Sequence, residues 1–426
     1  MANEWKDCSL GDVVELKRGY DLPQKERLPG DVPLVSSSGV TDCHAKAMVK
    51  GPGVVTGRYG TLGQVFYVEQ DFWPLNTTLY VRDFKGNDPR FVSYFLRNID
   101  FLVYSDKAAV PGLNRNHLHQ ARVRIPTDPK GQRAIAHILG TLDDKIELNR
   151  RANEALETMA RALFKAWFVD FEPVRAKMEG RWQRGKSMPG LPAHLYDLFP
   201  DRLVESEWGE IPEGWEISAL GHFVEAVKGR SYKSEELAES TTALVTLKSF
   251  ARGGGYRTDG LKSFTGKYKK EQIIEPGEVV VACTDVTQAA EIIGRAAIVR
   301  GTRRFQNLVA SLDTMIVRPR SERVTRAFLY HLGRSDSFVA HTYSHTTGTT
   351  VLHLGKEAIP TYQFVVPPRD IVRHFDAAAS NALLRIDSLE DESERLVTLR
   401  DTLLPKLISG ELRIKDVERF MDGVSA

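Results

Sequence analysis

Two long stretches of the chain carry apolar residues at intervals of three and four, the spacing of an amphipathic helix. In residues 129–167 these positions are Ile135, Ile138, Leu142, Ile146, Leu156, Met159 and Leu163. In residues 369–408 they are Phe375, Ala379, Ala382, Ile386, Leu389, Leu396, Leu403 and Leu407. At about 1.5 Å per residue each helix is about 55–60 Å long, and helices of that length need a partner along the apolar stripe. We expect the two helices to pack together as an antiparallel coiled coil.

Local signals mark the ends of these helices. Asp128 before Pro129 is a typical N-cap with proline in the first turn, and Ser409-Gly410 is a typical stop. Pro405 should bend or break the last turn of the second helix. Asn149 falls on the apolar seam, where a buried polar residue often sets the register of a coiled coil.

Before each long helix the chain is strand-rich and irregular. Residues 54–56 and 64–68 predict a pair of strands around a glycine-rich turn, and residues 279–282 and 295–299 predict a second pair. Between Phe171 and Trp215, proline and glycine recur often enough to indicate a linker.

The chain also contains a diverged internal repeat. Residues 5–15 (WKDCSLGDVVE) reappear as residues 215–225 (WEISALGHFVE), with Trp, Leu, Gly, Val and Glu at an offset of 210. Gly19 and Gly229 share this offset, and residues 76–82 parallel residues 312–318. Each copy closes on a strand-like segment that ends in Pro126 or Pro367, at an offset of 241. The sequence therefore predicts an α+β fold: two similar domains of small mixed or antiparallel sheets with helices, joined by the two long helices.

Composition narrows the class of protein. The 426 residues are 42% hydrophobic and 27% charged, and no apolar run approaches the roughly 18–20 residues that span a bilayer. The first residues are polar, unlike a secretory leader. Cys8, Cys43 and Cys283 are far apart and form no C-x-x-C, which argues against disulfides or a cysteine zinc site and favours a reducing cytoplasm. The net charge of +2 does not identify a partner.

Several segments resemble catalytic motifs, but the residues around them do not provide the structure that the chemistry needs. Residues 180–187 (GRWQRGKS) match a phosphate-binding loop, but charged residues precede them where a buried strand is needed. Asp12, Glu15 and Lys17 resemble a nuclease set, but they are crowded into one segment. No N-P-P-Y or D-P-P-Y tetrapeptide is present, and the histidines do not sit with carboxylates or cysteines at metal spacing. The chain is thus predicted to bind no metal.

The remaining polar motifs suit DNA binding. Residues 56–63 (TGRYGTLG) place Arg58 and Tyr59 on a glycine-framed turn, and arginine can read guanine while tyrosine can contact a base or phosphate. Residues 284–288 (TDVTQ) are the counterpart of this turn by position, and their Asp and Gln suit cytosine and adenine. A hairpin turn with incidental polar residues is the alternative for both segments.

Basic residues mixed with aromatic residues indicate a surface that follows phosphates, although a solvated face or helix-capping loops are open alternatives. The predicted DNA-contacting residues are Lys17, Arg18, Arg58, Tyr59, Thr61, Asn114, Arg115, Lys228, Arg230, Tyr232, Lys248, Arg252, Tyr256, Asp285, Thr287, Gln288, Thr347 and Thr349.

Taken together, the chain resembles the DNA-specificity subunits of type I restriction-modification systems (HsdS). The resemblance rests on residues 132–139 (QRAIAHIL), 142–149 (LDDKIELN), 163–171 (LFKAWFVDF), 211–215 (IPEGW) and 403–412 (LLPKLISGEL), whose order and spacing span nearly the whole chain. The second helix lacks the Asp-Asp-Lys-Ile segment of the first.

The resemblance implies two target recognition domains that each read half of a bipartite, asymmetric site in double-stranded DNA. The helices would set the spacing and dock two methyltransferase subunits, with restriction/translocase subunits completing the complex. S-adenosylmethionine, ATP and Mg would bind to those partners and not to this non-catalytic, cytoplasmic chain. The implied segments are recognition domain 1 (1–126), helix 1 (127–172), an irregular linker (173–208), recognition domain 2 (209–367), helix 2 (368–410) and a tail (411–426).

Two other functions fit the same sequence features. The chain could be a coiled-coil scaffold whose globular repeats bind protein, which salt-dependent DNA binding in the presence of methyltransferase subunits would exclude. It could instead be a self-contained DNA enzyme, which methylation by the purified chain alone would indicate.

Overall fold

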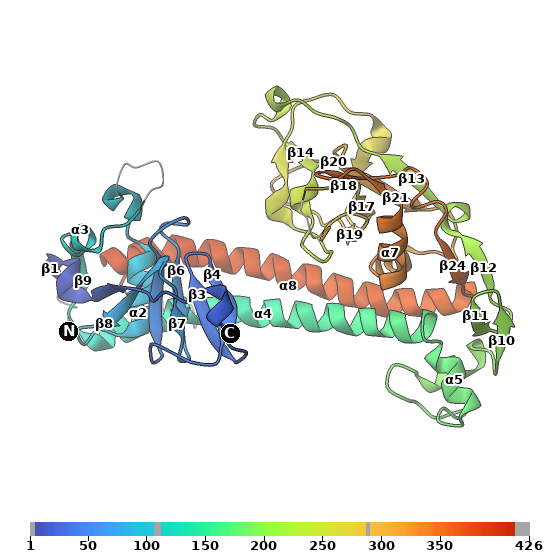
Figure 1. Ribbon diagram of the computed structural model, residues 1–426, viewed down its shortest axis with the longest axis horizontal. Coiled ribbons are helices and arrows are strands. Elements are labelled where there is room, and N and C mark those ends of the chain that lie inside the picture. The colour runs from blue at the N-terminus through green and yellow to red at the C-terminus, as the bar shows by residue number, and fades with distance from the viewer. Residues whose placement is uncertain (1–4, 106–111, 287–289, 414–426) are drawn as a thin grey trace. The chain divides into compact units, whose positions relative to one another are not determined.

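The computed structural model describes residues 5–105, 112–286 and 290–413, and the chain divides into two units (Figure 1). Unit 1 comprises Met1–Arg150 with Glu390–Ala426, and unit 2 is Arg151–Leu389. The division crosses both long helices, so each unit contains one part of each helix.

Unit 1 is built on an antiparallel sheet of order β2-β8-β5-β6 and a smaller sheet, β4-β3-β7, in which β3 and β7 are parallel. A third pair, β1-β9, joins the two ends of the domain. Its strands are β1 (Trp5–Ser9), β2 (Glu15–Arg18), β3 (Val32–Ser36), β4 (Gly39–His44), β5 (Gly53–Gly57), β6 (Val65–Val68), β7 (Trp73–Pro74), β8 (Thr78–Asp83) and β9 (Arg122–Pro126). Its helices are α1 (Leu10–Val13), α2 (Pro89–Arg97), α3 (Arg115–His119), the first part of α4 (Pro129–Phe168) and the last part of α8 (Arg369–Ser409).

Unit 2 repeats this plan with sheets of order β13-β21-β17-β19 and β15-β14-β20-β16 and the pair β12-β24. Its strands are β10 (Leu203–Ser206), β11 (Gly209–Pro212), β12 (Glu216–Ala219), β13 (Val224–Lys228), β14 (Thr242–Val245), β15 (Lys262–Ser263), β16 (Ile273–Ile274), β17 (Val279–Ala282), β18 (Thr284–Asp285), β19 (Ala296–Ile298), β20 (Asn307–Ala310), β21 (Thr314–Pro319), β22 (Thr346–Thr347), β23 (Leu352–Leu354) and β24 (Gln363–Val366). Its helices are the last part of α4, α5 (Glu172–Met178), α6 (Arg326–Leu332), α7 (Asp336–Ser344) and the first part of α8 (Arg369–Ser409).

The internal repeat is confirmed down to single hydrogen bonds. The Gly19 amide donates to the Thr78 carbonyl at 3.0 Å, and the Gly229 amide donates to the Thr314 carbonyl at 3.1 Å. A Cβ at either glycine would lie about 2 Å from a backbone oxygen, 2.2 Å from that of Leu75 or 2.0 Å from that of Ser311. Glycine recurs because the backbone has no room for a side chain there.

The two long helices are confirmed as an antiparallel pair. In unit 1, Asn149 of α4 is buried, and its Nδ2 donates to Glu392 Oε2 at 2.8 Å and to Ser393 Oγ at 3.3 Å on α8. In unit 2, the Phe375 ring of α8 lies against Phe164 at 5.6 Å between centroids. The early part of each helix thus meets the late part of the other. α8 continues through Pro405 to Ser409, so the proline does not break it.

Each unit completes its core with the last turns of a long helix from the other copy of the repeat. Leu407 and Ile408 of α8 belong to the core of unit 1, and a Cβ at Gly410 would lie 2.6 Å from the Trp5 ring. Phe164, Trp167 and Phe168 of α4 belong to the core of unit 2. The ends of the helices are therefore parts of the two domains as well as connectors.

The segment between α4 and β12 has little regular structure but packs around aromatic side chains. Trp182 is buried, and its Nε1 donates to the Lys186 carbonyl at 2.9 Å. Residues 180–187, which match the phosphate-loop pattern, follow helix α5 and not a strand. This context agrees with the rejection of that motif.

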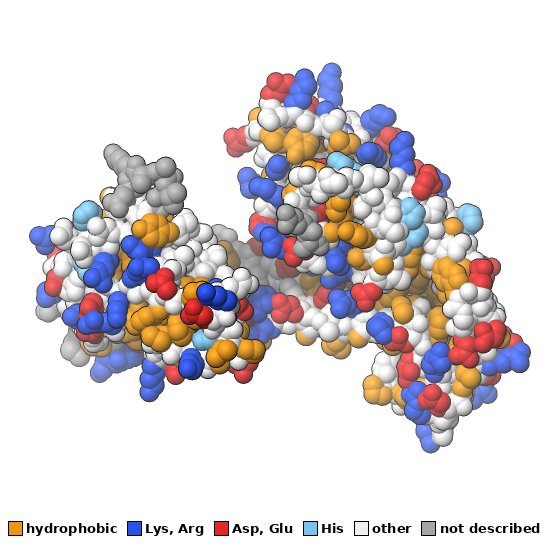
Figure 2. Space-filling view, viewed as in Figure 1, with side chains coloured by type: hydrophobic (Ala, Val, Ile, Leu, Met, Phe, Trp, Pro, Cys, Tyr) orange, Lys and Arg blue, Asp and Glu red, His pale blue; other side chains and the backbone are white. Residues whose placement is uncertain are grey.

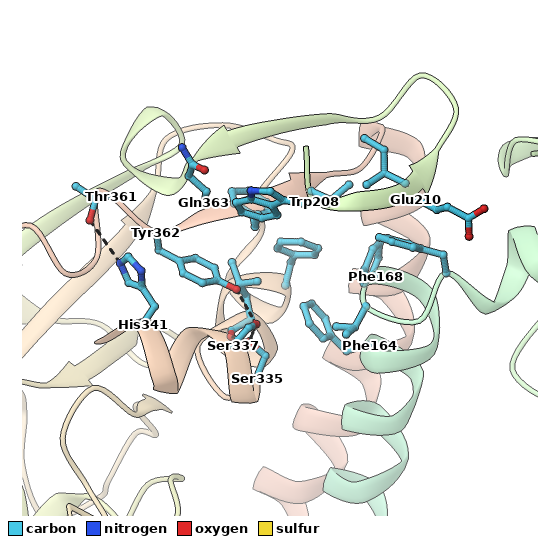
Figure 3. A pocket seen from close by; sticks show the side chains of 17 residues that line it. Phe164, Phe168, Trp208, Glu210, Ser335, Ser337, His341, Thr361, Tyr362 and Gln363 are labelled. Atoms are coloured by element: carbon cyan, nitrogen blue, oxygen red, sulfur yellow. Dashed lines mark hydrogen bonds between the residues drawn. The ribbon is translucent and has the colours of Figure 1, made fainter. Parts of the chain in front are cut away.

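Each unit has a groove beside the end of its long helix. In unit 2 a cavity of about 460 Å³ is lined by Phe164, Phe168, Trp208 and Tyr362, among others (Figure 3). The hydroxyls of Ser337 and Tyr362 hydrogen-bond across it at 2.9 Å. In unit 1 a groove of about 410 Å³ is lined by Ala121 and by residues 122–124 of β9. Residues 121–124 are the equivalents of residues 362–365 in unit 2.

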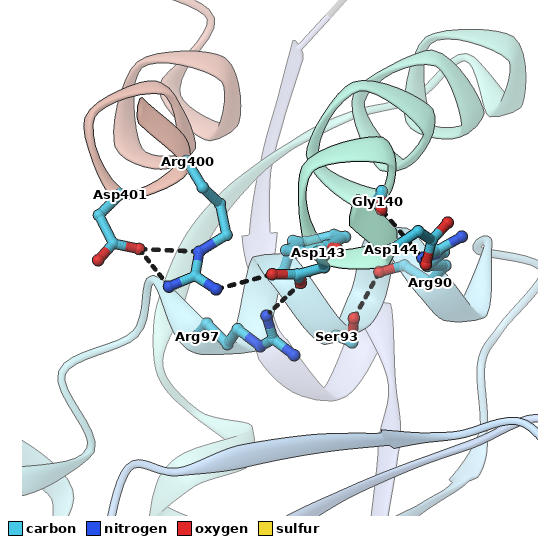
Figure 4. Close-up of polar contacts among 9 residues, drawn as sticks. Arg90, Ser93, Arg97, Gly140, Asp143, Asp144, Arg400 and Asp401 are labelled. Carbon is cyan, nitrogen blue, oxygen red and sulfur yellow. Dashed lines mark hydrogen bonds and ion pairs between the residues drawn. The ribbon is translucent and has the colours of Figure 1, made fainter. Parts of the chain in front are cut away.

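A carboxylate joins α2, α4 and α8 in unit 1 (Figure 4). Asp143 accepts hydrogen bonds from Tyr94 Oη at 2.7 Å, Arg97 Nη1 at 2.9 Å and Arg400 Nη1 at 2.7 Å. Burial alone would raise the pKa of Asp143, but the hydrogen bonds from Arg400 and Tyr94 outweigh it and the pKa is lowered. Asp144 beside it pairs with Arg90. The Asp-Asp segment of the sequence therefore anchors the helices.

Basic and acidic side chains are interspersed on the face drawn in Figure 2, in keeping with a net charge of +2. Within residues 5–105, 112–286 and 290–413, no helix is both long enough and apolar enough to cross a bilayer.

Leu407→Ala should lower the free energy of unfolding of unit 1 by about 2–4 kcal/mol, because it leaves a cavity in that core. Hydrogen exchange followed by mass spectrometry on peptides from β2 and β8 measures this. The control is Leu384→Ala on the same helix, where the side chain is 66% exposed; equal effects of the two changes would contradict the assignment.

Asp143→Asn should destabilise unit 1 by about 2 kcal/mol at pH 7, because Arg97 and Arg400 lose their shared carboxylate. Since the folded-state pKa of Asp143 is lowered, its stabilisation is present above the unfolded pKa and is lost as pH falls through the folded value. Urea unfolding between pH 7 and pH 3 should therefore show a smaller loss of stability in the variant than in the wild type.

Candidate nucleic-acid interface

Strand register brings the predicted DNA-contacting residues of unit 1 to one end of its main sheet, which we call loop end 1. Arg18, the last residue of β2, pairs with Leu79, and Gly57, the last residue of β5, pairs with Thr78. The Arg58 amide donates to the Thr77 carbonyl at 2.8 Å, and the Arg58 carbonyl accepts from the Leu113 amide at 3.0 Å. The segments that contain Lys17 and Arg18, Arg58 to Thr61, and Asn114 and Arg115 therefore meet at this end.

Arg58 is the best placed of these residues to contact a ligand. Its guanidinium carbon lies 4.6 Å from the centroid of the Tyr59 ring, and Tyr59 is 41% exposed. No carboxylate of the described part of the chain pairs with it, whereas Arg18 contacts Asp21 at 3.4 Å. An arginine without an acidic partner keeps all its donors for DNA.

Other residues of loop end 1 support the loops. The Asn114 side chain accepts from the Asn116 amide at 3.0 Å and caps α3, so the capping alternative applies to it. Arg115 and Thr61 are exposed. His119 Nε2 accepts from the Leu16 amide at 2.9 Å, and burial together with the charge of Arg115 lowers the pKa of His119. The neutral ring thus ties α3 to β2.

The equivalent surface of unit 2, loop end 2, shows which residues correspond one to one with those of loop end 1. The Cys283 amide donates to the Asp313 carbonyl at 2.7 Å, and the Cys283 carbonyl accepts from the Leu354 amide at 2.8 Å. Cys283 therefore occupies the place of Arg58. Residues 284–288 therefore correspond to residues 59–63, the later part of the turn, and the residue in the place of Arg58 is Cys283 and neither Asp285 nor Gln288.

Burial removes two of these positions from the surface. Cys283 is 5% exposed, and burial raises the pKa of its thiol to about 12. Asp285 is 1% exposed, and its Oδ2 accepts from the amides of Ile292 at 2.7 Å and Ile293 at 3.1 Å. Asp285 thus shapes the loop and has no exposed carboxylate for a base. Thr287 and Gln288 lie outside the described residues.

The remaining predicted DNA-contacting residues of unit 2 differ in whether their side chains already contact other residues of the chain. Arg252 pairs with Glu291 at 3.3 Å, and Arg230 pairs with Glu236 at 3.0 Å. Burial raises the pKa of Tyr256, whose hydroxyl is enclosed. Tyr232 lies under Lys262, with Nζ 5.7 Å from its ring centroid. The exposed candidates without such contacts are Lys228, Lys248, Thr347 and Thr349.

One residue at loop end 1 was missed. Tyr20 directly follows Gly19, and its hydroxyl hydrogen-bonds with that of Tyr80 at 2.9 Å. The internal repeat gives the signal that could have found it, because the offset of 210 pairs Tyr20 with Arg230. Among the described residues, no group of three or more His, Cys, Asp or Glu is placed to hold a metal ion.

Comparison with known proteins gives consistent matches. Residues 2–158 match the model of the type I restriction modification DNA specificity domain. The chain is 25% identical to the Type I restriction enzyme HindI specificity subunit of Haemophilus influenzae, covering 96% of this chain and all of that one. It is 24% identical to the MjaIX specificity subunit of Methanocaldococcus jannaschii, covering 98% and 95%. The crystal structure of a type I S subunit from M. genitalium shares the fold, with a TM-score of 0.57 at 14% identity over 95% of this chain and 96% of that one.

Thiol labelling tests the register at loop end 2. Cys43 is exposed, whereas burial raises the pKa of both Cys8 and Cys283. Iodoacetamide at pH 8 should therefore modify Cys43 at least tenfold faster than the other two thiols, as measured by mass spectrometry. Rapid native-state modification of Cys283 would contradict its placement.

Proposed function

The chain belongs to the family of type I restriction-modification DNA specificity subunits, and on this premise we propose that it selects the bipartite DNA sequence on which a type I complex acts. The observation that carries the proposal is the pair of loop ends, which share one backbone arrangement and present different side chains. Two such readers on one chain suit a site with two unlike halves.

The chemistry of loop end 1 fits DNA in particular. Arg58 and Tyr59 offer a guanidinium stacked on an exposed ring, a combination that reads base edges and contacts phosphates. At loop end 2, exposed Lys228 and Lys248 suit the phosphate backbone. Base-edge contacts supply sequence preference, and the lysines supply salt-dependent affinity.

The antiparallel helices would fix the spacing of the two half-sites. Readers on one face of DNA are spaced by about one helical turn of 34–36 Å or a multiple of it. A pair of helices held by Asn149 and Asp143 keeps a distance better than a flexible linker. The same helices would dock two methyltransferase subunits, with restriction/translocase subunits joining the complex in the cytoplasm.

In this assignment the chain has no catalytic role of its own. Adenine methylation with S-adenosylmethionine, and cleavage with ATP and Mg, would belong to the partner subunits. The alternative, a scaffold whose globular repeats bind protein, gains no specific support from the loop ends, whose basic residues Arg58, Lys228 and Lys248 suit the phosphates and bases of DNA.

Exchange of one reader tests the proposal. Replacing residues 209–367 with the equivalent segment of another specificity subunit should change one half of the methylated sequence and leave the other half unaltered. Genome-wide mapping of methylated adenines in cells that express the complex measures this. A single continuous palindrome, or a change in both halves, would refute the two-reader assignment.

Arg58→Ala should weaken or relax recognition of one half-site, with a loss of about 1–3 kcal/mol in base discrimination. Arg82→Ala is the matched control, because Arg82 lies near the opposite end of the same sheet and pairs with Glu15. Competition binding of the complex to duplexes altered in one half or the other gives the discrimination. Equal losses in both halves would count against the role of Arg58.

A further inference from the structure

The residue that follows the repeated glycine occupies the same backbone position at both loop ends. The Tyr20 amide donates to the Pro74 carbonyl at 2.8 Å, and the Arg230 amide donates to the Ala310 carbonyl at 3.0 Å. Each also forms an isolated parallel bridge, Tyr20 with Leu75 and Arg230 with Ser311. The backbone is the same, and the side chains differ completely in chemistry.

In unit 1 a layer of aromatic residues holds the Tyr20 side chain. Its hydroxyl bonds with that of buried Tyr80 at 2.9 Å, and the Trp73 ring meets it edge-on at 6.4 Å between centroids. Lys17 Nζ lies 5.4 Å from the centroid of the Tyr20 ring. These contacts therefore fix the orientation of the half-buried Tyr20 ring at loop end 1.

In unit 2 an acidic residue and an aromatic residue hold Arg230 in the same way. Its Nη2 donates to Glu236 Oε1 at 3.0 Å and to Oε2 at 3.4 Å, and its Nε donates to the Ser231 carbonyl at 2.8 Å. The guanidinium carbon lies 5.3 Å from the centroid of the buried Phe264 ring.

The space for this arrangement comes from Gly266. A Cβ at that position would lie 2.3 Å from Glu236 Oε1, so the glycine leaves room for the carboxylate.

One nitrogen of this fixed guanidinium remains available. Arg230 Nη1 has no acceptor in the described part of the chain, and it is not among the buried unpartnered atoms. The side chain keeps 25% of its surface exposed. A donor whose orientation is set before binding loses little entropy when it meets its acceptor.

We propose that residues 20 and 230 occupy a further specificity-determining position of their respective domains, and that surrounding side chains fix the orientation of each. Arg230 donates to the purine acceptors O6 or N7, which favours guanine, and Tyr20 offers an apolar ring edge that suits the thymine methyl group. Glu236 is the positioning residue for Arg230. The inference rests on the proposed function and names the chemistry of its two readers.

A base contact explains the arrangement better than a phosphate contact. A phosphate needs only a positive charge, which exposed Lys228 supplies nearby on a flexible side chain. A guanidinium whose plane is fixed by a carboxylate and a ring has directional donors, and directional donors discriminate between bases.

The experiment uses the whole chain in complex with its methyltransferase partner, with methylated adenines mapped across a genome. Arg230→Lys keeps the charge and removes the fork of donors. It should relax one base position in one half-site, with discrimination falling about tenfold or more. Glu236→Gln should relax the same position, because the guanidinium stays charged but loses its fixed orientation.

Glu235→Gln is the matched control for Glu236→Gln. Glu235 is exposed and pairs with exposed Lys233 at 3.6 Å, so this variant should methylate the wild-type sequence. The half-site read by unit 1 is an internal control for folding and assembly in every variant of unit 2. Conversely, Tyr20→Ala should relax one position in the half read by unit 1 alone.

The outcomes separate this inference from the proposed function. A uniform loss of methylation over all sequences in Arg230→Lys, or an unaltered sequence in both Arg230→Lys and Tyr20→Ala, would overturn the inference. Relaxation of different positions by Arg230→Lys and Glu236→Gln would overturn the positioning role of Glu236. A wild-type complex that methylates without sequence preference would instead refute the proposed function.

Discussion

The structure depends on the antiparallel packing of α4 against α8, because this contact also completes both recognition domains. In unit 1 the last turns of α8 supply Leu407 and Ile408 to a core made otherwise by the first copy of the repeat. In unit 2 the last turns of α4 supply Phe164, Trp167 and Phe168 to the core of the second copy. Neither copy can bury its apolar face without the helix of the other. The two copies of the repeat therefore exchange the ends of their long helices.

Polar contacts give this apolar packing a defined register. Asn149 bonds across the seam to Glu392, where a misaligned pair of helices would leave its amide without a partner. Tyr94 reaches Asp143 on α4, and Tyr330, which follows Thr314 at the same interval as Tyr94 follows Thr78, reaches Glu157 on α4. Each domain is thus fastened to the helices by an equivalent tyrosine and a carboxylate of its own.

The sequence predicted what periodicity and repetition encode, and it failed where strand register decides. The long helices, the paired strands at Val55 and Val280 and the glycine shared by residues 19 and 229 follow from spacing alone. The exposed side chains of the loops could not be predicted in the same way. Polar residues in a sequence carry little information about strand register, and segments distant in the sequence decide which of them are buried. Asp285 was predicted to contact a base, but its side chain is buried and accepts hydrogen bonds from two backbone amides. Tyr20, which no sequence motif singled out, lies at loop end 1. Pro405 was expected to bend or break the last turn, but α8 continues through it to Ser409.

The packing of the last turn of α8 into the core of unit 1 has a consequence for biosynthesis. The strands of the first copy leave the ribosome by Pro126, but Leu407 follows only about 280 residues later. At roughly 5–20 residues per second, the nascent first copy waits for roughly 15–60 s with the face that receives α8 still open to water. During that interval it is an apolar surface awaiting its cover, the kind of surface that chaperones shield and that neighbouring nascent chains can capture. The core of unit 1 is therefore completed only after the last turn of α8 has been synthesised.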